Sequence, residues 1–255
     1  MNVSQSNVQR YLERIGISGE MRVDYNSLRL IQERHMLSVP FENLNIVNGL
    51  PIELDWDFLY DKIVAKRRGG YCYELNGLLA LILKSVGYHV SLISGQVFRN
   101  DGTFGPDFDH MVLLVHLDNG YIVDVGFGDS VRSPLLLSGE VVVDISGSYR
   151  IIPELNSDVL FFQKRFRGEW VSEFRFTLKP RQIEDFSDMN VYQQTSPESH
   201  FTQNLIVSKA TPDGRISISG DSFIETIGSD KNRRPILSND ERNDLLKRYF
   251  GIAVV

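Results

Sequence analysis

Apolar residues recur at helical spacing through the first third of the chain. One stripe falls at i, i+3, i+4 and i+7, which predicts a first helix that ends at Gly16. Ser27 is placed to cap a second helix, and residues 57–64 predict a third. The clearest helix begins next to Cys72 and carries an apolar stripe as far as Gly87, which is placed to end it.

Apolar and polar positions alternate beyond Gly87, as they do in strands. The segments YHVSLISGQVF, HMVLLVHL and YIVDVGF each indicate a strand, and the DNG before the last of them is a hairpin signal. Several more short strands with glycine turns follow, and their spacing predicts a small barrel or a curled sheet. From about residue 186 the pattern is mixed, with a short helix over 188–194, a hairpin around 212–214 and a helix over 238–250.

The elements follow one another as helices, then strands, then a mixed region. We therefore expect an α+β protein with a helical part over residues 1–87, a strand-rich part over 88–187 and a mixed part over 188–255. With 255 residues, 42% of them hydrophobic and 24% charged, the chain has the composition of a globular protein with a substantial core.

Charge and cysteine content narrow the possible partners. The formal net charge is −6, so a general affinity for nucleic acid or for an anionic membrane is not expected. No stretch approaches the roughly 18 apolar residues that a membrane-spanning helix needs, and the N-terminal pattern does not resemble a signal peptide. The single cysteine cannot form an internal disulfide, which fits a reducing compartment, so we expect a cytoplasmic protein.

That single cysteine, Cys72, lies in the stretch RRGGYCYELNG. Gly69 and Gly70 permit a sharp turn and a close backbone approach just before the helix begins. Cys72 is then expected near the N-terminus of the helix, where free N–H groups favour a thiolate and are suited to stabilise an oxyanion. The alternative, an inert cysteine that packs in the core, stays open on these residues alone.

A thiol nucleophile works best at neutral pH beside a histidine that takes its proton and pairs with it. His110 begins a strand at the rim of the predicted sheet, whereas His116 lies deeper in that strand and is expected to be structural. Asp124 places a charge in the apolar strand YIVDVGF, so a partner has to compensate it, and it is placed to orient the histidine. A carboxylate bonded to backbone amides is the alternative for Asp124.

The predicted hairpin limits how His110 and Asp124 can meet. Because side chains alternate along a strand, the two share a face only if the connecting loop has an odd number of residues. A three-residue loop over 118–120, with Gly120 in the left-handed conformation, meets this condition. It places Asp124 opposite Leu114, roughly 13 Å from His110 along an ideal strand, so coiling, a bulge or a longer loop has to close the distance.

Four blocks of the sequence resemble the arylamine N-acetyltransferase family, in the family's order and along nearly the whole chain. They are SVPFENLNI, RGGYCYELNGLL, HMVLLV with YIVDVGFG, and EDFSDMNVYQQTSPESHFT with TPDGR. The resemblance implies an N-terminal helical bundle, a central β-barrel domain and a C-terminal α/β lid, around a core similar to that of papain-like peptidases and transglutaminases. It also puts the Cys-His-Asp triad of the family on Cys72, His110 and Asp124.

The resemblance implies an enzyme that uses acetyl-CoA as a co-substrate, with no tightly bound cofactor and no metal site. The Cys72 thiolate attacks the thioester and CoA leaves. The nitrogen of an arylamine, arylhydrazine or arylhydroxylamine then takes the acetyl group, while His110 manages the protons. Acetyl-CoA and small aromatic amines or hydrazines are therefore the expected partners, and the oligomeric state is left open.

The resemblance also gives roles to residues around the triad. Phe127 and Phe201 are expected to line the acceptor site, with Tyr71 beside them. Arg68 is expected to bond to Glu42 in the PFEN segment and so to fix the turn that presents the cysteine. Removing one partner of such a buried pair costs about 3–5 kcal/mol.

Thr103, Gly105 and Gly126 are the expected contacts of CoA, and the first two lie in a region where this chain departs from the family. Vertebrate members carry a Ser-Thr-Gly stretch shortly before the histidine, which helps to hold CoA. This chain has GTFGPDFDH there, so Asp107 and Asp109 bring negative charge towards a polyanionic co-substrate. The way in which CoA lies is therefore left open.

Two other functions are compatible with the same residues. A Cys-His-Asp triad also serves transglutaminase-like and peptidase-like enzymes, because one constellation supports several acyl chemistries. The second alternative is a non-enzymatic protein that binds small aromatic amines, and a thiol that reacts like a free one at Cys72 would favour it.

Overall fold

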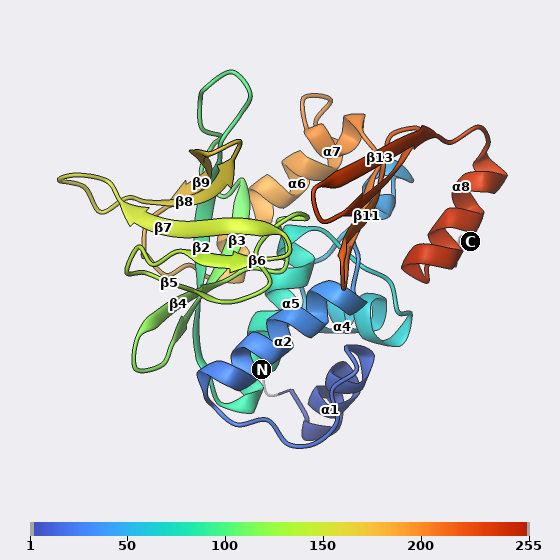
Figure 1. Cartoon of the computed structure of the whole chain (residues 1–255). Coiled ribbons are helices and arrows are strands. Elements are labelled where there is room, and N and C mark those ends of the chain that lie inside the picture. The colour runs from blue at the N-terminus through green and yellow to red at the C-terminus, as the bar shows by residue number, and fades with distance from the viewer. Residues whose placement is uncertain (1–2, 254–255) are drawn as a thin grey trace.

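A helical part, a curled sheet and a second sheet follow one another along the chain (Figure 1). The computed structural model describes residues 3–253. The expected α+β architecture is confirmed, with a helical bundle first, a barrel-like sheet in the centre and an α/β lid last. Within the described residues, no helix is both long and apolar enough to cross a membrane.

The helices of the first third pack around α5, the helix that begins at Cys72. Their bounds are α1 Gln5–Arg14, α2 Tyr25–Ser38, α3 Leu44–Val47, α4 Trp56–Tyr60 with a π-helical turn over Asp61–Ala65, and α5 Cys72–Val86. Asp24 caps α2 in place of the predicted Ser27, since its carboxylate accepts the Ser27 N–H at 2.8 Å. Gly87 ends α5 as predicted, in the left-handed conformation with φ of 114°.

Eight antiparallel strands form the curled sheet, in the order β5-β4-β3-β2-β9-β8-β7-β6. Their bounds are β2 His89–Val97, β3 His110–His116, β4 Gly120–Val123, β5 Leu135–Leu136, β6 Val142–Asp144, β7 Gly147–Pro153, β8 Leu160–Phe166 and β9 Glu169–Phe176. β5 also lies against β7, so the sheet is nearly closed. Buried aliphatic and aromatic side chains such as Ile93, Phe162 and Phe174 fill its interior.

The second sheet joins segments from both ends of the chain, in the order β1-β10-β11-β12-β13. Its strands are β1 Phe41–Glu42, β10 Ile206–Thr211, β11 Gly214–Ser219, β12 Ser222–Ile227 and β13 Asp230–Pro235. The accompanying helices are a 3₁₀ turn over Ile183–Phe186, α6 Ser187–Thr195, α7 His200–Gln203 and α8 Asn239–Leu245 with a π-helical turn over Leu246–Phe250. Because Phe41 pairs with Ser208, the PFEN segment is an edge strand of the lid.

Candidate active site

Cys72 is the first residue of α5, and two glycines let the preceding chain pass close to its neighbours. A Cβ on Gly69 would lie 1.9 Å from a backbone carbonyl oxygen, and one on Gly70 would lie 2.7 Å from the Glu74 side chain. Neither glycine has a positive φ, whereas Arg67 adopts the left-handed conformation with φ of 54°. The turn therefore needs these glycines because they lack a side chain, and not because of their conformational freedom.

His110 and Asp124 form a hydrogen-bonded pair beside Cys72. His110 Nε2 lies 2.8 Å from Asp124 Oδ2, and both side chains are almost completely buried. The imidazole and Cys72 both line one cavity. Burial lowers the pKa of His110, but the charge and hydrogen bond of Asp124, together with the nearby Cys72 side chain, outweigh it and raise that pKa to about 10. His110 is therefore an imidazolium at neutral pH, the form that pairs with a thiolate.

The β3–β4 hairpin brings His110 and Asp124 together in a register that differs from the predicted one. Its loop has three residues, as predicted, but it spans 117–119, and Gly120 belongs to β4 without a positive φ. This register places Asp124 opposite position 112 instead of 114, two residues closer to His110. β4 ends at Val123, so Asp124 leaves the sheet and turns towards the histidine.

The second histidine of β3 does not lie where it was expected. His116 is exposed at the far end of the strand and is not deep within the sheet. Its ring stacks on that of His89, with the ring centroids 4.5 Å apart. His116 therefore takes no part in the site around Cys72.

Asn76 completes the surroundings of Asp124, although its sequence position alone did not single it out. Its Nδ2 donates to Asp124 Oδ1 at 2.9 Å, and its Oδ1 accepts the Val125 N–H at 3.0 Å. The Gly126 N–H donates to the same Asp124 oxygen at 2.8 Å, so Asp124 has backbone and side-chain partners as well as the histidine. The signal for Asn76 was its polar side chain one helical turn after Cys72, inside the apolar stripe of α5.

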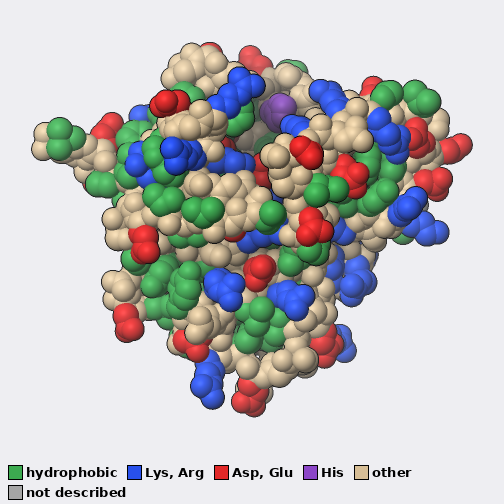
Figure 2. Space-filling view, viewed as in Figure 1, with side chains coloured by type: hydrophobic (Ala, Val, Ile, Leu, Met, Phe, Trp, Pro, Cys, Tyr) green, Lys and Arg blue, Asp and Glu red, His purple; other side chains and the backbone are tan. Residues whose placement is uncertain are grey.

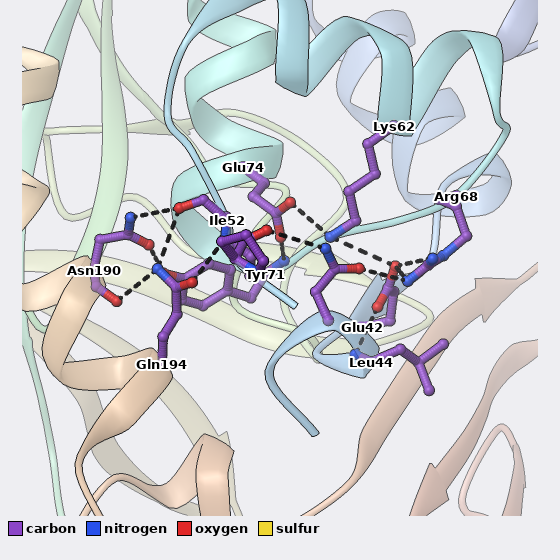
Figure 3. A network of polar contacts seen from close by, with 11 residues as sticks. Glu42, Leu44, Ile52, Lys62, Arg68, Tyr71, Glu74, Asn190 and Gln194 are labelled. Atoms are coloured by element: carbon purple, nitrogen blue, oxygen red, sulfur yellow. Dashed lines mark hydrogen bonds and ion pairs between the residues drawn. The ribbon is translucent and has the colours of Figure 1, made fainter. Parts of the chain in front are cut away.

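Four largely buried charged side chains brace the turn that leads to Cys72 (Figure 3). Arg68 contacts Glu42, with Nη2 at 2.7 Å and Nε at 3.0 Å from the same carboxylate oxygen. Lys62 Nζ lies 2.6 Å from Glu74 Oε1 and 3.8 Å from Glu42 Oε1. Glu74 also accepts the Tyr71 N–H at 3.1 Å, which caps α5. The two positive and two negative charges balance, and of these contacts the family resemblance had implied only the Arg68–Glu42 pair.

A cavity of about 800 Å³ lies over Cys72 and His110, and Figure 2 shows a hollow on this face between the barrel and the lid. Phe127 and Phe201 both line it, and the Phe127 ring lies 5.2 Å from the His110 ring between centroids. Tyr71 does not border the cavity, because it is fully buried behind Phe201 with the ring centroids 5.5 Å apart. Tyr71 therefore lies behind the lining, and its expected role beside the substrate stays a prediction.

Of the three residues expected to contact CoA, Gly126 alone borders this cavity. A Cβ on Gly126 would lie 2.7 Å from Cys72 Cα, so only a glycine fits there. Thr103 is exposed, and its hydroxyl donates to Asp101 at 2.6 Å, outside the cavity lining. Gly105 is buried beneath the cavity wall and is also outside the lining. The arginine and lysine side chains in the lining are those of Arg99, Arg215 and Lys231.

A cysteine and a charged imidazole at the wall of a cavity, with a carboxylate hydrogen-bonded to the imidazole, define a thiol enzyme of the Cys-His-Asp type. The fold has close counterparts among solved structures. A family model described as N-acetyltransferase matches residues 24–255.

Known arylamine N-acetyltransferases resemble this chain along nearly its whole length. A pineal gland isozyme from Gallus gallus is 34% identical over 275 residues, which cover 97% of this chain and 94% of that protein. The solved enzyme of Salmonella typhimurium has a TM-score of 0.93 at 29% identity, over 99% of this chain and 93% of that one. The Mycobacterium marinum enzyme in complex with CoA has a TM-score of 0.89 at 31% identity, over 96% and 92% of the two chains. This chain belongs to the arylamine N-acetyltransferase family.

Proposed function

We propose that this chain transfers the acetyl group of acetyl-CoA to arylamines, arylhydrazines or arylhydroxylamines through an acetyl-Cys72 intermediate. The observation that carries the proposal is the arrangement of Cys72 and His110 in the cavity wall, with Asp124 hydrogen-bonded to the histidine behind it. Membership of the arylamine N-acetyltransferase family supports the choice of donor and acceptor over peptidase or transglutaminase chemistry.

The same two groups serve both half-reactions. In the first, the Cys72 thiolate forms a bond to the thioester carbon, the bond from that carbon to the CoA sulfur breaks, and the leaving thiolate takes the proton of His110. In the second, the acceptor nitrogen bonds to the acetyl carbon and gives its proton to the neutral imidazole. The bond to Cys72 then breaks and the thiolate–imidazolium pair returns. Backbone N–H groups at the start of α5 are placed to stabilise the oxyanion.

We assign the two substrates to different walls of the cavity. Phe127 and Phe201 offer aromatic faces for an acceptor ring. Arg215 and Lys231 lie in the lining on the side of the second sheet, where positive charge suits the phosphate groups of CoA. Gly126 stays in this assignment as a close neighbour of the thioester, and Thr103 and Gly105 do not.

The predicted division of the chain into three parts, at residues 87 and 187, fits the roles that the proposed reaction gives to the residues of each part. The nucleophile would belong to the first part, the histidine and aspartate to the second, and the lid wall to the third. Separate apolar clusters inside the curled sheet and beneath the second sheet support it. A cytoplasmic location is part of the proposal, because the lone thiol of Cys72 has to stay reduced to react.

A single experiment tests the two-step order. Enzyme is mixed with acetyl-CoA without any acceptor, free CoA is measured, and the protein is analysed by mass spectrometry for an acetyl group on Cys72. One equivalent of CoA and one acetyl group are expected, and Cys72→Ala gives neither. CoA that appears only after an arylamine is added would contradict the acetyl-enzyme.

A further inference from the structure

Asp109 precedes His110 and lines the same cavity as Cys72, Phe127 and Phe201. Neither half-reaction described above makes use of it. Any acceptor whose nitrogen reaches the acetyl group on Cys72 has to place its ring and ring substituents within this cavity. Asp109 is therefore part of the wall that the acceptor meets.

The Asp109 carboxylate is held in place by the lid and by its own loop. Its Oδ1 accepts a hydrogen bond from Gln193 Nε2 at 3.0 Å. The Gln193 amide is itself oriented, because its Oε1 accepts the Ser199 hydroxyl at 2.6 Å, and both residues are buried. The other oxygen lies against Gly105, where a Cβ would come within 2.1 Å of it. Gly105 thus makes room for the Asp109 side chain.

The charge of Asp109 has no salt-bridge partner among the described residues. Asp129, also in the cavity lining, differs in this respect, because Lys164 and Arg215 neutralise it at 3.0 and 3.1 Å. Burial raises the pKa of Asp109, while the positive charges of Arg99 and His110 oppose that rise. The result is a partly buried negative charge beside the acceptor space.

We propose that Asp109 determines acceptor specificity by charge: it favours neutral or cationic aromatic amines and hydrazines and disfavours acceptors that carry a carboxylate. The inference rests on the proposed function, since it concerns the acceptor of that reaction. Like charges that face each other across a binding site are strongly disfavoured, and partial burial reduces their screening by solvent.

The test compares two acceptors that share one ring, para-aminobenzoate and para-aminobenzamide, with acetyl-CoA as the donor. The ratio of their kcat/KM values is measured for the native enzyme and for Asp109→Asn, which keeps an oxygen for Gln193. Dividing one ratio by the other removes the difference in intrinsic nucleophilicity of the two amines. We expect the relative kcat/KM for para-aminobenzoate to rise by roughly 10- to 50-fold in Asp109→Asn, as expected for two charges about 7 Å apart at an effective dielectric constant near 20.

Asp107→Asn is the matched control, because it removes the same charge from the same loop. Unlike Asp109, Asp107 lies outside the lining of the cavity over Cys72. This variant should leave the ratio within about twofold of the native value, as for a solvent-screened charge. Asp109→Ser serves as a second neutral variant in case Asp109→Asn does not fold. Each variant is first checked for CoA release on mixing with acetyl-CoA alone.

The outcomes separate this inference from the proposed function. A native enzyme that releases no CoA and acetylates neither acceptor overturns the proposed function. Normal CoA release and acetylation of para-aminobenzamide, with an acceptor ratio that neither Asp109 variant changes, overturns the role of Asp109 alone. An equal change in both acceptors shows that Asp109 positions His110 and does not select substrates, which also overturns the inference.

Discussion

Replacing Lys62 by Met tests whether the buried charges behind Cys72 hold the start of α5. The Lys62 side chain is 6% exposed, and those of Glu42 and Glu74 are fully buried. Glu42 would keep its two bonds from Arg68, but Glu74 would keep only the Tyr71 N–H. The loss therefore falls on Glu74, which becomes a buried charge without a counter-charge.

The expected cost of Lys62→Met is about 3–5 kcal/mol in the free energy of unfolding, the range for a buried ion pair that loses one partner. This is a large part of the roughly 5–15 kcal/mol that a folded domain has. Glu74→Gln alone should also destabilise, because it leaves Lys62 with only the longer 3.8 Å contact to Glu42. The double variant should cost less than the sum of the two single changes, by about 1–3 kcal/mol.

Equilibrium unfolding in urea measures the free energy of unfolding of all three variants. The dependence of this free energy on pH gives a second test. Burial raises the pKa of Glu74, while Lys62 opposes the rise, so removing Lys62 raises it further. A carboxylate whose folded pKa exceeds its unfolded value of 4.5 binds protons preferentially in the folded state. Its contribution to stability is therefore lost as pH rises from 4.5 through the folded pKa. The gap between Lys62→Met and the native protein should widen as pH rises above 4.5.

Lys66→Met is the matched control for this series. Lys66 pairs with Asp61 at 2.6 Å, the same distance as the buried pair, but their side chains are 69% and 54% exposed. An exposed pair of this kind is worth no more than about 1 kcal/mol. Two results together would refute the reasoning. The losses in free energy of unfolding caused by Lys62→Met and Glu74→Gln would be strictly additive, and the difference in stability between Lys62→Met and the native protein would not vary with pH.

Two further predictions concern the triad and its closest neighbour. Because the pKa of His110 is raised from 6.5 to about 10, its pairing contributes stability that is full below pH 6.5 and lost towards pH 10. Between these pH values, the free energy of unfolding of Asp124→Asn, measured in urea, should depend less on pH than that of the native protein. An equal dependence on pH would contradict the pairing. Gly126→Ala places a Cβ 2.7 Å from Cys72 Cα, so acetyl transfer should fall by roughly 100-fold. Gly77→Ala, whose Cβ would meet nothing closer than 3.5 Å, should stay active, and equal losses in the two variants would refute the steric reason.

Elements whose evidence is local could be predicted well from the sequence. α5 is the best example, because its apolar stripe, the glycines before it and Gly87 after it all act within one segment. The position of Cys72 at its first residue followed from the same signals. The order of helices, strands and mixed elements also follows from periodicity alone, and it was sufficient for the fold class.

Features that depend on distant segments could not be predicted in this way. Phe41 pairs with Ser208 across most of the chain, and no local pattern indicates which strand takes β1 as its edge. The sequence analysis did not single out Lys62 and Glu74, because nothing local shows that their side chains turn inwards to each other. The hairpin loop was misplaced by one residue because both positions of a three-residue loop satisfy the parity rule.

Asp124 reaches His110 by leaving the sheet, and the surrounding side chains explain why this is tolerated. Strand residues that leave a ladder lose partners for their backbone groups, which must be replaced if they are buried. Asn76 accepts the Val125 N–H at 3.0 Å, and Gln32 Nε2 donates to the Asp124 carbonyl at 3.4 Å. Two amide side chains from helices thus substitute for the missing strand, and one of them also binds the Asp124 carboxylate. The helix that carries the nucleophile therefore also sets the position of the carboxylate, which ties the geometry of the triad to α5 more than to the hairpin.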